Sequence, residues 1–217
     1  FVFGLLSLLA LWRILPRDDT RMHQPVPFLQ SMQLVLRHLP ALVGLSVGLL
    51  ISASNETVGI VFGAWMEEAF ELKVAALGAA SAVIGLAELS GEGLVGGLVD
   101  RIGKRRAVVV GVSLNVVACL LLPALNFHIE SALIGLFIFF VTFEFAVVSA
   151  IPLMTELIPH ARATLMAGYA AAFSAGRMIG ALIGPTLFER GLLTNGIAAA
   201  LLDVLALILL IAFVKQD

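Results

Sequence analysis

Six long runs of apolar residues, separated by short polar stretches, make up most of this chain. Each run is close to or above the ~20 residues that a helix needs to cross a bilayer. The runs are continuous and rich in Gly, Ala and Leu, whereas a membrane barrel would show ~10-residue segments that alternate apolar and polar residues. The pattern therefore predicts an all-α membrane protein with a bundle of six transmembrane helices, at residues 41–66, 74–99, 107–126, 131–155, 164–187 and 196–214.

The residues before the first long run predict two further segments. Residues 1–15 are apolar but too short to span a bilayer, and they lack the basic region and cleavage site of a signal peptide. We expect them to be the end of a preceding transmembrane helix that begins outside this chain. Residues 16–40 are expected to form a cytoplasmic linker, and the apolar spacing of residues 27–38 predicts a short helix on the membrane surface. A plain connector is the simpler interpretation of this linker.

Composition supports a membrane protein and argues against several other classes. Hydrophobic residues make up 60% of the chain and charged residues 13%, against roughly 25% charged residues in an ordinary soluble domain. The 13 Lys and Arg residues gather at helix ends and form no basic face, so we expect no nucleic-acid partner. Cys119 is the only cysteine, and the four histidines lack the paired spacing of a zinc site. We therefore expect no metal and no cofactor.

The positions of Lys and Arg predict the orientation of the bundle, because cytoplasmic loops carry an excess of these residues. Two cations, Lys73 and Arg190, fall on one side of the predicted membrane, and Arg177 falls inside a predicted helix. This distribution places both residues 16–40 and the C-terminus in the cytoplasm. The ten cations on the cytoplasmic side are Arg13, Arg17, Arg21, Arg37, Arg101, Lys104, Arg105, Arg106, Arg162 and Lys215.

A motif lies between the second and third predicted helices. Residues 96–106 (GGLVDRIGKRR) match the pattern G-x-L-x-D-R-x-G-[RK]-[RK] at every fixed position. Gly96 permits close helix contact, Asp100 can pair with a cation or cap a helix, and Gly103 permits a tight turn. A loop that served only to orient the chain would need cations, such as Arg101, Lys104 and Arg105, but no glycine or aspartate at fixed positions. This segment, the signature loop, resembles the signature loop of the major facilitator superfamily.

A second motif, at residues 156–164 (ELIPHARAT), is similar to an E-x-x-P-x-x-R-[AG] segment of many permeases in that family, and its fixed positions are Glu156, Pro159 and Arg162. In the family the first motif joins helices 2 and 3 and recurs, often weakened, between helices 8 and 9, and the second lies before helix 5 or 11. If residues 1–15 are the end of helix 6, the two motifs of this chain fall between helices 8 and 9 and between helices 10 and 11. The resemblance therefore implies a C-terminal six-helix half, helices 7 to 12 after the end of helix 6, with the N-terminal half missing from this chain. It also implies a small-molecule substrate and alternating access.

Four polar residues in the middle of predicted helices are candidate site residues. A charged side chain at mid-helix costs at least ~2.5 to 3.5 kcal/mol on insertion scales. Glu56, which follows Asn55, and Glu144 lie about halfway along their helices, at the depth where the family has its central cavity. We expect them to bind substrate or protons, although each could instead be a hydrogen-bonded acid that locks helices together. Arg177 needs an acidic partner, which Glu144 or Glu56 would supply, or it could bind an anionic group of the substrate.

Three more acids fall in or near the predicted membrane spans. Glu88 and Glu92 are four residues apart and share one helical face, where two like charges repel. We expect them to line a vestibule on the cytoplasmic side. Asp203 is expected nearer the outer end of its helix, where it would reach water, and is not a candidate site residue. On the fifth helix, Gly176, Gly180 and Gly184 form a strip of small residues that predicts close helix packing.

Together these features predict a secondary active transporter that is not an enzyme. We expect it to move a small solute by alternating access in a bacterial-type plasma membrane, among membrane lipid, with coupling to H+. The segment at residues 156–164 favours efflux. Two alternatives remain: a membrane enzyme such as a phosphatidyl-transferase, whose D-x-x-D-G-x-x-A-R pattern is absent here, and a six-helix scaffold that transports nothing.

Overall fold

The computed structural model describes residues 27–214 together with Leu5, Ala10 and Arg13. Apart from these three residues, the helix end predicted at residues 1–15 and the first part of the predicted linker lie outside the described residues. The short helix predicted within the linker is present as α2 (Phe28–Arg37). Its placement on a membrane surface stays a prediction.

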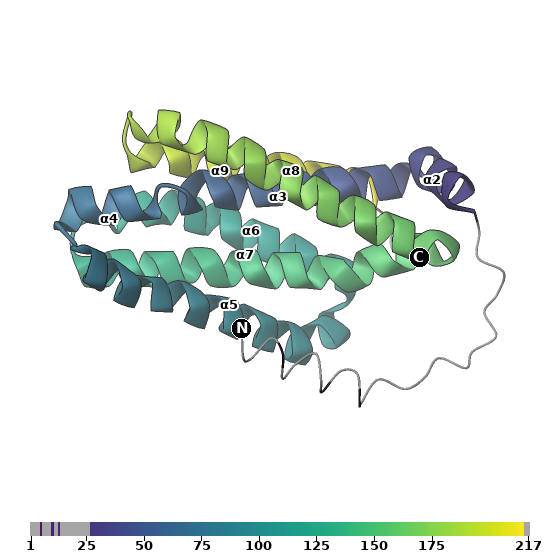
Figure 1. Cartoon of the computed structure of the whole chain (residues 1–217), viewed down its shortest axis with the longest axis horizontal. Coiled ribbons are helices and arrows are strands. Elements are labelled where there is room, and N and C mark those ends of the chain that lie inside the picture. The colour runs from purple at the N-terminus through teal and green to yellow at the C-terminus, as the bar shows by residue number, and fades with distance from the viewer. Residues whose placement is uncertain (1–4, 6–9, 11–12, 14–26, 215–217) are drawn as a thin grey trace.

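The described residues form helices and short turns, with no strand among them. Six segments are long and apolar enough to cross a membrane, which confirms the predicted all-α six-helix bundle (Figure 1). The 3-10 turn Pro159–Ala161 leads into the fifth of these segments. The spanning segments are α3 (Leu39–Gly59) continued by α4 (Phe62–Phe70), α5 (Val74–Ile102), α6 (Lys104–Ala124), α7 (Ile129–Leu157), α8 (Arg162–Phe188) and α9 (Leu192–Phe213).

The first predicted span is wrong in one respect, because it is not a continuous helix. α3 ends at Gly59 and α4 begins at Phe62. At the break the N–H of Val61 donates to the carbonyl of Val58, only three residues earlier, which tightens the turn. Gly59 has a low intrinsic helix propensity and stands at the break. The interruption therefore falls one helical turn beyond Glu56, a predicted site residue.

The bundle has two chemically different ends. The end where α5 meets α6 and α7 meets α8 carries Arg101, Lys104, Arg105, Arg106 and Arg162, and we call it the cationic end. The opposite end carries more acids than cations, and we call it the acidic end. Its exposed carboxylates are Glu67, Glu68, Glu71, Glu130 and Glu189.

The spans are arranged around α3 and α7. α3 packs most extensively against α8 and also against α9, whereas α7 packs against α5 and α6, and α6 closes the bundle against α9. α5 therefore lies along one edge and α8 along the opposite edge (Figure 1). Buried apolar side chains fill the space between the helices in one cluster toward the cationic end and a second cluster toward the acidic end.

The strip of small residues on α8 faces α3. Gly176, Gly180 and Gly184 are buried, and a Cβ atom at any of them would overlap the backbone of α3. At Gly176 the obstacle is the carbonyl of Leu49, and at Gly180 it is the carbonyl of Ala53. The predicted close packing is confirmed, and only glycine permits the two backbones to approach so closely.

Polar side chains also join the helices, because backbone and side-chain polar groups in lipid must find partners within the protein. The Asn195 amide of α9 donates to the carbonyl of Thr57 at 2.8 Å and to that of Gly184 at 2.9 Å. It thereby links α9 to α3 and α8. The Ser54 hydroxyl of α3 donates to the carbonyl of Ala199 on α9 at 3.0 Å.

We predict that Gly176→Ala lowers the free energy of unfolding by roughly 1–3 kcal/mol, the usual cost of overpacking a core, because the backbone carbonyl of Leu49 cannot move aside. The control is Gly78→Ala on α5, where a Cβ would meet no atom within 4 Å. Chemical unfolding in mild detergent measures both variants. If both substitutions changed the free energy of unfolding equally, helix propensity would explain the change and the contact between α3 and α8 would not.

Candidate functional site

A cavity of about 420 Å³ opens in the middle of the bundle. Four helices build it, and α3, α7 and α8 contribute more than one residue each. All four residues that the sequence predicted for the site line this cavity, and Glu88, predicted for a separate vestibule, lines it as well. The lining residues are Asn55, Glu56, Gly59, Glu88, Phe140, Phe143, Glu144, Val147, Phe173 and Arg177.

Glu56 and Arg177 form an ion pair across the contact between α3 and α8. The Arg177 Nε donates to the Glu56 Oε2 at 2.8 Å. The sequence left either Glu144 or Glu56 as the partner, and the structure identifies Glu56. A guanidinium carries five N–H donors, and among the described residues Arg177 has a hydrogen-bond partner only at Nε. The rest of this cationic group borders the cavity.

The acids that line the cavity from α5 and α7, Glu88 and Glu144, have no such cation among the described residues. Glu144 lines the same cavity as the ion pair and forms no ion pair with a described residue. Glu88 and Glu92 are close enough to interact electrostatically with Glu144, and like charges repel. α5 approaches Glu144 closely because Gly91 has no side chain, since a Cβ there would overlap the Cβ of Glu144. Three carboxyl groups therefore lie near one another, and two of them, Glu88 and Glu144, line the cavity.

Asn55 and three aromatic rings complete the walls. The Oδ1 atom of Asn55 is buried and accepts no hydrogen bond from any described residue, which leaves it available to a donor in the cavity. Phe140, Phe143 and Phe173 supply apolar surface, and the last two rings lie 6.4 Å apart. Sequence reasoning missed these rings. Phe140 precedes Glu144 by four residues and so shares its helical face, a spacing that pointed to the same cavity.

The signature loop occupies the cationic end, at a distance from the cavity. Gly103 alone joins α5 to α6, and its φ of +88° lies in a region that favours glycine. Gly96 makes no close helix contact among the described residues, because a Cβ there would meet no atom within 4 Å, and its predicted role stays a prediction. Asp100 is exposed and makes no ion pair with a described residue, and Arg101 is also exposed.

The two motifs meet at this end. The Lys104 ammonium forms an ion pair with the carboxylate of Glu156, so the start of α6 is tied to the end of α7. Pro159 begins the 3-10 turn that follows, and the Arg162 Nε donates to the carbonyl of Thr155 at 3.2 Å. Arg105 reaches across to α9, where it donates to the carbonyl of Ile211 at 3.0 Å. These residues fasten helix ends and do not line the cavity.

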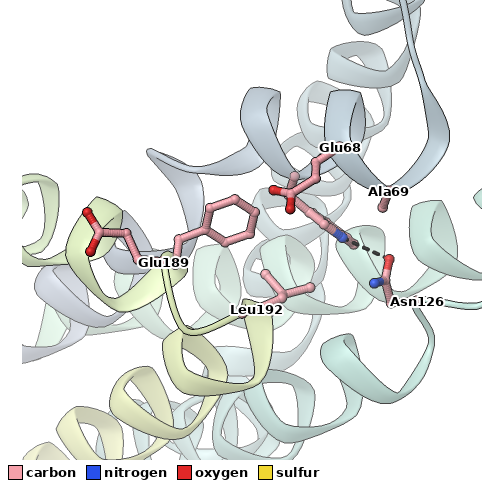
Figure 2. A pocket seen from close by; sticks show the side chains of 8 residues that line it. Glu68, Ala69, Asn126, Glu189 and Leu192 are labelled. Carbon is pink, nitrogen blue, oxygen red and sulfur yellow. Dashed lines mark hydrogen bonds between the residues drawn. The ribbon is translucent and has the colours of Figure 1, made fainter.

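A second pocket, of about 330 Å³, lies at the acidic end and contains none of the predicted site residues. Figure 2 shows Glu68 of α4 and Glu189, which follows α8, beside it. Trp65 donates its indole N–H to the Oδ1 atom of Asn126 at 2.8 Å and so fixes one wall. The sequence reasoning singled out none of these residues, because none is an ionisable group inside a predicted membrane span, and Glu68 lies just beyond the predicted span at 41–66.

The expectation for Asp203 is wrong. Asp203 stands near the middle of α9 and is completely buried. The predicted run at 196–214 placed it nearer the outer end, but α9 begins four residues earlier, at Leu192, and packs against α3 and α6 at this depth. Asp203 is therefore an interior polar residue that lies outside the cavity.

The described residues thus form six helices that are long and apolar enough to span a membrane, and charged side chains line a cavity between four of them. The family model of the Major Facilitator Superfamily matches residues 44–216, and the chain belongs to this family. The predicted resemblance is confirmed, and six helices are consistent with half of the family fold. Family membership points to a transporter with a small-molecule substrate and away from an enzyme. Neither the search of curated proteins nor the search of solved structures gave a match.

We predict that Glu56→Gln lowers the free energy of unfolding by roughly 1–3 kcal/mol, because it removes a charged hydrogen-bond acceptor and leaves Arg177 without its partner. The double variant Glu56→Gln with Arg177→Gln should recover a large part of the free energy of unfolding that Glu56→Gln alone loses. Glu130→Gln, an exposed acid at the acidic end, is the matched control and should change little. Additive effects of the two single substitutions in a double-mutant cycle would contradict a coupled pair.

Proposed function

We propose that this chain is part of a secondary active transporter that couples the movement of a small solute to protons and works as an exporter. The observation that carries this proposal is the position of Glu144, which lines the cavity beside Glu88 without a cationic partner among the described residues. A carboxyl group in such a place can bind and release a proton as the cavity opens to each side in turn. Substrate and proton would then compete for the same group of carboxylates.

The other cavity residues have complementary roles in this proposal. Arg177, held by Glu56, presents its remaining N–H groups to the solute, and Asn55 offers an unpaired amide oxygen. Phe140, Phe143 and Phe173 provide apolar surface, so a solute with both polar and apolar parts fits the walls. Three cavity carboxylates against one guanidinium favour protons or a cationic solute over an anionic one.

The rest of the mechanism also remains a proposal. An N-terminal six-helix half would supply the opposite wall of the cavity, and rocking between the halves would give alternating access. The cations gathered at one end favour a cytoplasmic position for that end and for the C-terminus in a plasma membrane. Export is supported only by the similarity of residues 156–164 to a segment of family permeases.

We predict that Glu144→Gln abolishes proton-coupled flux of the native protein in liposomes under a pH gradient, because glutamine keeps the shape of the side chain but carries no exchangeable carboxyl proton. Glu56→Gln should reduce flux through the loss of the Arg177 contact. The assay follows a pH-sensitive dye on addition of each of a panel of cationic and neutral solutes.

Glu130→Gln, on the same helix as Glu144 but outside the cavity, is the matched control and should keep wild-type flux. Unchanged flux in Glu144→Gln would refute the coupling role. Absence of solute-dependent flux in the wild type across the panel would favour the scaffold, and product formation from a lipid substrate would favour the enzyme.

A further inference from the structure

Asp203 is enclosed by α3 and α6 in the interior of the bundle, on the side of α3 away from the ion pair with Arg177. It is fully buried, and its Oδ1 atom has no hydrogen-bond partner among the described residues. Its Oδ2 atom lies 3.7 Å from the Sγ atom of Cys119 on α6. Ser54 of α3 also adjoins the carboxyl group. Neither the cavity nor the pocket at the acidic end includes Asp203.

Among the described residues, no cation faces this carboxyl group from the helices packed against α9. On α3 the ionisable residue is Glu56, which borders the cavity and is paired with Arg177 of α8. On α6 the cations stand in the first turn, roughly 20 Å from Cys119 at 1.5 Å per residue. Cys119 itself is the one titratable group in contact with Asp203 among the described residues. An ionised, unpaired carboxylate in such surroundings is strongly unfavourable.

The hydrogen-bond chain through Cys119 determines where a proton must be. The Nδ2 atom of Asn115 donates to the carbonyl of Phe139 and to the hydroxyl of Thr142, both at 2.9 Å. Its Oδ1 atom therefore faces Cys119, at 3.8 Å from the sulfur. A thiol carries one proton and can donate to one acceptor only. If Asp203 were ionised, Cys119 would stand between two acceptors, and one of its two contacts would have no hydrogen.

We propose that Asp203 is a proton-binding site separate from the central cavity, and that its bound proton joins α9 to α6. The protonated carboxyl donates to the Cys119 sulfur, and the thiol donates to the Oδ1 atom of Asn115. Both hydrogens in the hydrogen-bond chain from Asp203 through Cys119 to Asn115 then have an acceptor, and Asp203 carries no charge. The proton is a structural ligand of the bundle, and its presence does not depend on the proposed transport mechanism.

The first test is infrared difference spectroscopy of the native protein in lipid at neutral pH. Asp203→Asn should remove the carbonyl band of a protonated carboxylic acid from the spectrum. Cys119→Ala should shift that band to higher frequency, because it removes the hydrogen-bond acceptor. Glu130→Gln, the exposed acid, should remove only bands of an ionised carboxylate. Loss of only ionised-carboxylate bands in Asp203→Asn would overturn the proposal.

The second test is thermal stability as a function of pH. The folded protein holds a proton at Asp203 that the unfolded chain releases, so raising the pH favours unfolding. The melting temperature of the wild type should therefore fall more between acidic and alkaline pH than the melting temperature of Asp203→Asn. Cys119→Ser, which keeps a donor and acceptor at this position, should follow the wild type. Parallel curves for the wild type and Asp203→Asn would contradict a protonated Asp203.

If Asp203→Asn does not fold, Cys119→Ala decides the question in the folded protein. A shifted carboxylic-acid band supports a proton on Asp203, and an unchanged spectrum in that region overturns it. Both measurements are independent of solute flux. A flux assay that refuted proton-coupled transport would therefore not affect the proposal for Asp203. An infrared or melting result that refuted a proton on Asp203 would likewise not affect the proposed transport function.

Discussion

The close contact between α3 and α8 is the feature on which the rest of the structure depends. Gly176, Gly180 and Gly184 carry no side chains, so the two backbones approach until carbonyl groups of one helix meet glycines of the other. Arg177 follows the first of these glycines, and the approach brings its guanidinium to within hydrogen-bond distance of Glu56. Without that approach, both charged side chains would stand alone in the membrane. The glycine strip on α8 therefore makes the ion pair between Glu56 and Arg177 possible.

Polar groups inside the bundle are accommodated in three different ways. Ser54 and Asn195 bond to backbone carbonyls of neighbouring helices and strengthen the packing. Glu56 has a cation as its partner. Glu144 has no cationic partner among the described residues and borders a cavity. Two residues of the same type therefore have different surroundings, a cation for Glu56 and the cavity for Glu144.

The sequence predicted the helices better than it predicted the contacts between helices. Run length and apolar continuity identified six spans, because lipid demands both. Asn55, Glu56, Glu144 and Arg177, each of which interrupts an apolar run near its middle, line one cavity, and their role in binding stays a prediction. The partner of Arg177 stayed open, because the relative rotation of two helices is a tertiary property. Asp203 was misplaced for the same reason: its depth and its neighbours depend on how α9 packs.

The junction at Gly103 has a mechanical consequence. A single residue connects two long helices there, so no flexible loop is available to absorb a displacement of α5. The first turn of α6 is anchored on both sides, through Lys104 to α7 and through Arg105 to α9. Any tilt of α5, which packs chiefly against α7 along one edge, must therefore pivot at this glycine. Such a tilt would displace the far end of α5 most. It would also change the distance between Glu88, which lies halfway along α5, and Glu144.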